Sequence, residues 1–103
     1  MTEKDGCGEL REKLNNETAK LPWAELQRHF ANGAIIKVAA ANDLVDVAVA
    51  MAMDDTAVIA AGMEAGTIVR ASEEDARQWE QNDRPLWAVV VAPWVLVQEV
   101  TGY

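Results

Sequence analysis

The segment LWAVVVAPWVLVQ, residues 86–98, decides the fold class. Trp87, Val89 and Val91 alternate with positions that are also apolar, so both faces of this segment are apolar. That pattern predicts a β-strand covered by other parts of the chain on both sides. Because Pro93 has no N–H to donate to a sheet, we expect the strand to bend, bulge or lie at a sheet edge there, with extended structure resuming beyond it.

Two further strands and five helices are expected around this segment. The strands are short β-branched runs at residues 34–39 and 67–71. The helices follow from apolar spacing, from capping residues and from the glycines that end them. They span residues 9–20, 22–33, 44–53, 54–65 and 72–82, some with their caps included. The sequence therefore predicts an α+β fold with about five helices around a small sheet of three or four strands.

The helix at residues 44–53 is predicted to be the central one. Asp46 is its only polar residue, and a helix that is apolar almost all round is usually buried on most sides. The order helix–strand–helix–turn–helix–strand over residues 22–71 suggests a winged-helix-like core. Gly62 lies inside the fourth helix, where glycine costs about 1 kcal/mol relative to Ala, so close packing of that helix is expected.

Length and composition indicate a small acidic protein. The chain has 103 residues, half of them apolar, and a formal net charge of -8. We interpret residues 1–8 as a flexible tail and residues 9–103 as a single globular domain. The negative charge disfavours nucleic acid and anionic membranes as partners. No segment has the pattern of a secretory signal or a membrane span, so a cytoplasmic location is expected.

The residues that could carry chemistry are few. One Cys and one His give neither a disulfide framework nor a Cys/His metal site, and no cofactor or metal is expected. Glu25 and His29 are four residues apart and can pair on one helix face; a surface ion pair is the simpler interpretation and a functional site the alternative. Ser72, Asp54 and Asp55 are interpreted as helix caps. No catalytic residue is assigned, and the balance is against an enzyme.

Four Trp residues are many for a chain of this length. Rings in such number usually belong to the core. Trp87 and Trp94, on either side of Pro93, are nevertheless candidates to anchor a partner or a second subunit. The apolar C-terminal strand would then offer an open edge, which is a natural seam for a homodimer.

Three segments carry a resemblance to a known family. They are LREKLNNETAKLPWAELQRHFANG from residue 10, DLVDVAVAMAMDDTAVIAAGMEAG from residue 43 and LWAVVVAPWVLVQE from residue 86. Together they resemble a small bacterial family known as domain of unknown function 2288, from about Leu10 to Glu99, and APWVLVQE is the most specific part. The resemblance implies a single bacterial domain, and it carries no catalytic or binding residue over to this chain.

Three classes of function stay open at this point. The leading hypothesis is a small protein-interaction or oligomerisation module, because nucleotide and catalytic signatures are missing and Trp is abundant. The alternative is a small ligand-binding domain or an enzyme that uses carboxylates around a pocket. Nucleic-acid binding ranks last, because the fourth helix has no Arg, Lys, Asn or Gln to contact bases.

Overall fold

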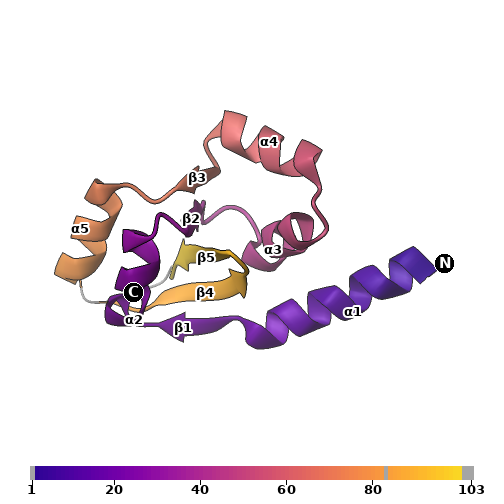
Figure 1. Ribbon diagram of the computed structural model, residues 1–103, viewed down its shortest axis with the longest axis horizontal. Coiled ribbons are helices and arrows are strands. Elements are labelled where there is room, and N and C mark those ends of the chain that lie inside the picture. Colours follow the sequence, from indigo (N-terminus) through magenta and orange to yellow (C-terminus); the bar gives the residue numbers. More distant parts are fainter. Residues whose placement is uncertain (1, 83, 101–103) are drawn as a thin grey trace.

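A five-stranded sheet forms the middle of the structure (Figure 1). The computed structural model describes residues 2–82 and 84–100, and the side chains from residue 8 onward. The strands are β1 (Ala19–Leu21), β2 (Ile35–Val38), β3 (Ile68–Arg70), β4 (Leu86–Val91) and β5 (Trp94–Glu99). Their order in the sheet is β1-β4-β5-β2-β3. The α+β class is confirmed, and the sheet has five strands instead of the three or four that were predicted.

The segment around Pro93 forms a tight hairpin. β4 and β5 pair antiparallel from Leu86↔Glu99 to Val91↔Trp94, and Ala92 and Pro93 connect them through a cis peptide bond. The bend predicted at Pro93 is therefore confirmed. The open edge predicted for the C-terminal strand is wrong, because β5 also pairs parallel with β2 and so has neighbours on both sides. The edges of the sheet are β1 and β3 instead.

Five helices cover both faces of the sheet in the described residues. They are α1 (Thr2–Glu17), α2 (Trp23–Ala31), α3 (Leu44–Ala52), α4 (Thr56–Ala65) and α5 (Glu73–Asn82). Helices α1, α3 and α4 contribute to the core on one face, and α2 and α5 to the core on the other. The fold thus has three layers, and the sheet, rather than the helix at residues 44–53, lies at its centre.

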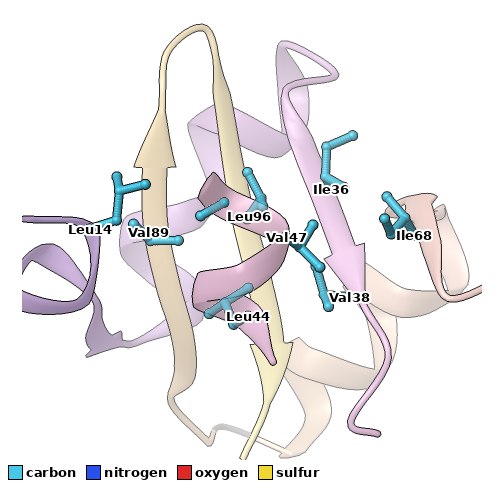
Figure 2. Close-up of a cluster of buried hydrophobic side chains, with 9 residues drawn as sticks. Leu14, Ile36, Val38, Leu44, Val47, Ile68, Val89 and Leu96 are labelled. Carbon is cyan, nitrogen blue, oxygen red and sulfur yellow. The ribbon is translucent and has the colours of Figure 1, made fainter. Parts of the chain in front are cut away.

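The core on the first face is aliphatic (Figure 2). Leu44 and Val47 of α3 lie over the strands next to Leu96, and Leu14 of α1 lies beside Val89 of β4. The remaining buried members are Ile36, Val38, Ala48 and Ile68. Because α3 packs on α1, α4, β4 and β5, it is the most buried helix of this face, as its apolar sequence indicated.

The core on the second face contains two of the four Trp residues. Trp23 of α2 and Trp79 of α5 pack with ring centroids 5.5 Å apart, and Trp79 Nε1 donates a hydrogen bond of 3.0 Å to Glu99 Oε2. Both rings are buried against β4 and β5. Glu80, the next residue of α5, is exposed.

Of the predicted helix caps, Ser72 and Asp55 are confirmed, whereas Asp54 precedes the N-cap of α4 and does not cap the helix. The side chain of Asp43 accepts hydrogen bonds at the start of α3, and that of Asp55 accepts one from Val58 N–H at the start of α4. Ser72 and Asp75 form a reciprocal cap on α5, with Asp75 N–H donating to Ser72 Oγ and Ser72 N–H to Asp75 Oδ2. Helices that begin at defined caps fix the positions of the loops between layers.

Two details at the N-terminal end differ from the sequence prediction. The first helix begins at Thr2 instead of Glu9 and ends at Glu17 instead of Lys20. The residues that follow form β1, which was not predicted. The order helix–strand–helix–turn–helix–strand is present as α2-β2-α3-α4-β3, but within a five-stranded sheet that has helices on both faces, which is a larger assembly than the winged-helix-like core suggested.

Candidate interaction surface

Helix α4 is apolar but has no buried residue. Its sequence, TAVIAAGMEA, contains one charged side chain, yet Val58 is 47% exposed and Met63 is 56% exposed. Only Ile59 and Gly62 on this helix are partly buried. Apolar helices of this kind are normally covered by other parts of a protein. The apolar sequence of α4 suggested a helix packed inside the protein, but in the structure most of these apolar side chains lie on the surface.

A hollow of about 410 Å³ lies between α4 and the sheet. We call it the α4 groove. Most of its lining is apolar and comes from α4, β3, the end of α3 and the start of β5. The lining residues are Ile36, Met51, Asp54, Asp55, Thr56, Ile59, Ala60, Met63, Ile68, Val69, Arg70 and Trp94. Two of them are methionines, whose flexible side chains adapt to the shape of a bound surface.

Trp94 and Arg70 form one wall of the α4 groove. The guanidinium carbon of Arg70 lies 5.2 Å from the centroid of the Trp94 ring, a cation–π contact. Arg70 is the one basic residue in the lining. Trp94, predicted as an anchor for a partner, is half-buried and borders this mostly apolar hollow. Its role in binding stays a prediction.

Two carboxylates line the α4 groove. Asp54 and Asp55 lie at the start of α4, and Glu64, the charged residue of the helix itself, follows the lining residue Met63 without being part of the lining. None of the ion pairs between described residues involves these three side chains. By contrast, the other two acids of this region, Asp43 and Asp46, both pair with Arg11. The groove thus combines an apolar floor with two carboxylates at the start of α4, which we call its acidic rim.

Trp87 lies away from the α4 groove. It is paired with Gln98 at the opposite end of the hairpin from Trp94. It is half-buried against the aliphatic core, and Lys20 Nζ lies 5.1 Å from its ring centroid. The structure therefore does not bring the two predicted Trp anchors together.

Glu25 and His29 lie on α2, which covers the opposite face of the sheet. They border a shallow hollow that they share with Leu21, Ala24 and Arg28. No ion pair or hydrogen bond joins Glu25 to His29 among the contacts of the described residues, although their spacing would allow one. The predicted cluster exists as neighbouring side chains, and it is separate from the α4 groove.

Comparison with known proteins gives the family. A model of the family described as Protein of unknown function (DUF2288) matches residues 9–99. The chain belongs to this family. It is similar to the NMR solution structure of PA1075 from Pseudomonas aeruginosa, with 48% sequence identity and a TM-score of 0.81 over 90% of this chain and 86% of that chain. No curated protein matches the chain.

The family description assigns no function, so the site has to be judged on its geometry. Within the described part of the chain, no three His, Cys, Asp or Glu residues gather in a way that could hold a metal ion. No helix there is long and apolar enough to cross a membrane. Polar and charged side chains are absent from the buried set of the described residues.

The sequence prediction named one residue of the α4 groove, Trp94, and missed the rest. Arg70, Ile59 and Met63 were assigned to a strand and a helix with no functional role. The available signal was the run of apolar residues on α4, but this pattern is the same for a buried helix and for an exposed one. Only the tertiary arrangement distinguishes the two.

Proposed function

We propose that this member of the DUF2288 family is a protein-interaction module and that the α4 groove is its contact surface. One observation carries the proposal: α4 is apolar along its length and contributes no buried residue to the core. Large exposed apolar side chains next to a hollow are typical of protein-binding sites. Met53, Val58 and Met63, three of the four large exposed apolar residues in the described chain, belong to α4 or to the turn before it.

A small-ligand site or a carboxylate-based enzyme is supported less well. The volume of the α4 groove suits a small apolar molecule. However, sites for small molecules usually hold a few fixed polar groups, and the described residues have no buried polar side chain that could act so. Asp54 and Asp55 are both exposed, so water would screen them from a substrate.

We further propose a bacterial cytoplasmic setting. The similar structure comes from Pseudomonas aeruginosa, a bacterium. The single Cys, which cannot form a disulfide within the chain, is consistent with a reducing compartment. Duplex DNA is not an expected partner, because α4 and the turn before it carry acids and no Arg or Lys.

Site-specific photocrosslinking in the native host tests the proposal. A photoreactive residue is placed at Ala60 on α4, which is exposed and lines the α4 groove, and in a separate variant at Val90 on β4, which is 54% exposed and points to the other face of the sheet. We expect a discrete protein adduct from position 60 and none from position 90. Adding Met63→Glu should remove that adduct, whereas His29→Ala should leave it unchanged.

The mass and the position of the crosslinked adduct show whether the protein binds itself or another protein through the α4 groove. An adduct with the mass of two chains would identify self-association as the form of the interaction. An adduct of the same mass from both positions, or an adduct at position 60 that survives Met63→Glu, would contradict the proposal. Circular dichroism and thermal melting of each variant establish that the fold is retained.

A further inference from the structure

We infer that the α4 groove receives a basic amphipathic helix of another protein. This inference rests on the proposed function and adds the chemistry of the partner. An amphipathic helix would place its apolar face on the apolar floor of the groove and its cationic side chains at the acidic rim. Helix-in-groove docking of this kind is a recurring mode of recognition.

The charges around the groove favour a cationic partner. Asp54, Asp55 and Glu64 have no ion-pair partner in the described chain, and the sequence has no Lys or Arg between Lys37 and Arg70. The lining holds two of these carboxylates and one cation, Arg70, which stacks on Trp94. The net charge of -8 adds a long-range attraction for basic segments.

The same charges disfavour a second copy of the chain. In a twofold symmetric contact each patch meets itself. If two α4 helices packed antiparallel, Glu64 of one copy would approach Asp54 and Asp55 of the other. Two bodies that each carry a charge of -8 would also repel each other.

The shape of the site favours a helix over an added strand. β3 is an edge strand, but it has only three residues, so an extended peptide would gain few backbone hydrogen bonds there. The hollow lies between α4 and the side chains of Ile36, Ile68 and Trp94. A ten-residue helix such as α4 is about 15 Å long, which gives about three turns of parallel contact.

Synthetic helical peptides provide the probe. The first peptide combines a leucine face with a lysine face, the second replaces every lysine by glutamate, and the third scrambles the first so that no apolar face remains. Binding is measured by calorimetry and by the change in Trp fluorescence, to which Trp94 would contribute. We expect the first peptide to bind, with an affinity that falls as salt rises, and the other two to bind at least tenfold more weakly.

A double variant tests the contribution of the acidic rim. Asp54→Asn with Asp55→Asn removes two charges but keeps the shape, because Asn is as good a helix cap as Asp and tolerates the positive φ of 57° at position 54. We expect this double variant to bind the lysine peptide about threefold to tenfold more weakly and with less dependence on salt. Glu25→Gln, on the opposite face, is the matched control and should have no effect.

Met63→Glu distinguishes docking from unspecific attraction. It adds a negative charge, so a peptide attracted by charge alone would bind more tightly, whereas a peptide seated in the groove would lose an apolar contact and bind more weakly. We expect weaker binding of the lysine peptide.

Equal binding of the glutamate peptide, or full affinity in the Asp54→Asn, Asp55→Asn variant, would overturn the inference and leave the proposed function standing if the adduct at position 60 is found. A dimer in sedimentation that Met63→Glu dissociates would overturn it in favour of a second copy. If Met63→Glu weakens neither the peptide complex nor the adduct at position 60, both the inference and the proposed function are contradicted.

Discussion

Gly62 of α4 lies against the side chain of Ile68 of β3 so closely that a Cβ at position 62 would be 2.3 Å from Ile68 Cδ1 and 2.6 Å from Cγ1. Real Cβ atoms do not approach other atoms to such distances. The missing side chain therefore lets α4 approach the sheet at this point. Since α4 and β3 are two walls of the α4 groove, this contact also sets the position of the exposed apolar surface.

Gly62→Ala is expected to destabilise the protein. Helix propensity alone would favour Ala by about 1 kcal/mol, but the added methyl group meets a buried, β-branched side chain that cannot rotate freely. Overpacking of this kind costs about 1–3 kcal/mol, so after the gain in helix propensity we expect a net loss of up to about 2 kcal/mol in the free energy of unfolding. Urea denaturation measures it.

Combining Gly62→Ala with Ile68→Val supplies the control. Removing Cδ1 takes away the shortest contact, so the double variant should lose less stability than the sum of the two single variants. Full additivity, or an increase in stability for Gly62→Ala alone, would show that α4 moves away from β3 without cost.

The two core Trp residues differ in how their ring N–H groups are satisfied. Trp79 Nε1 donates to Glu99, whereas Trp23 Nε1 is buried with no partner among the described residues. Substitution by Phe removes the N–H and part of the ring in both cases. Only Trp79→Phe also breaks a hydrogen bond, while Trp23→Phe removes an unsatisfied donor. We expect Trp79→Phe to cost about 1–2 kcal/mol more than Trp23→Phe in thermal or urea unfolding.

Glu99→Ala tests the origin of that difference. In the Trp79→Phe background it should change stability less than in the wild type, because the bond is already lost. Equal effects in both backgrounds would assign the cost of Trp79→Phe to lost ring packing alone.

The sequence predicted those parts of the fold whose signals are local. The caps at Asp55 and Ser72 depend on a side chain and the next few N–H groups, and both are present. The close packing expected at Gly62 is confirmed, and so is the bend at Pro93. Each of these features is determined within a few residues of the chain, which is why a sequence pattern reveals it.

The parts that were missed depend on distant pairings. β1 has three residues that are mostly exposed, and it exists because it pairs with β4 some seventy positions away. The open edge assigned to β5 was wrong for a related reason, since the parallel partner β2 lies far away in the sequence. The apolar character of both faces of residues 86–98 is that of an inner strand, and this observation already argued against an edge.

The candidate site could be predicted from the sequence only in part, for the same reason. Trp94 was singled out by residue type, but its contact with Arg70 joins β5 to β3, and this contact follows only from the strand order. Trp87, Glu25 and His29 were named by the same kind of reasoning and lie elsewhere on the molecule. Residue type thus identified Trp94, whereas its neighbour Arg70 could be identified only from the order of the strands in the sheet.

Asp75 links stability to pH. Its burial alone would raise its pKa, but hydrogen bonds from Ser72 N–H, from Lys37 and from Ser72 Oγ, together with the Lys37 charge, hold the pKa below the usual value of 3.8. A carboxyl group with a lowered pKa in the folded state stabilises the protein above the pKa it has when unfolded. That contribution is lost as the pH falls through the lower, folded value.

We therefore expect Asp75→Asn to lower the free energy of unfolding by roughly 2 kcal/mol at pH 7. The difference from wild type should shrink as the pH falls below about 3.8, which is followed by urea denaturation at a series of pH values. Glu74→Gln, which removes only an exposed pair with Arg77, is the control and should cost less than about 1 kcal/mol. A pH-independent difference would show that Asp75 acts as a cap alone.

Deletion of residues 1–8 tests where the folded domain begins. The described packing of α1 on the rest of the protein starts at Leu10, which is half-buried, and centres on Leu14, which is buried against Val89. Arg11 adds contacts with Asp46 and Asp43. Because these contacts all lie beyond residue 8, we expect the deletion to change the free energy of unfolding by no more than about 0.5 kcal/mol. Leu14→Ala, in contrast, should cost about 2–5 kcal/mol. A deletion that costs as much as Leu14→Ala would place residues 1–8 within the cooperative fold, and protection of their amides in hydrogen exchange would give the same answer independently.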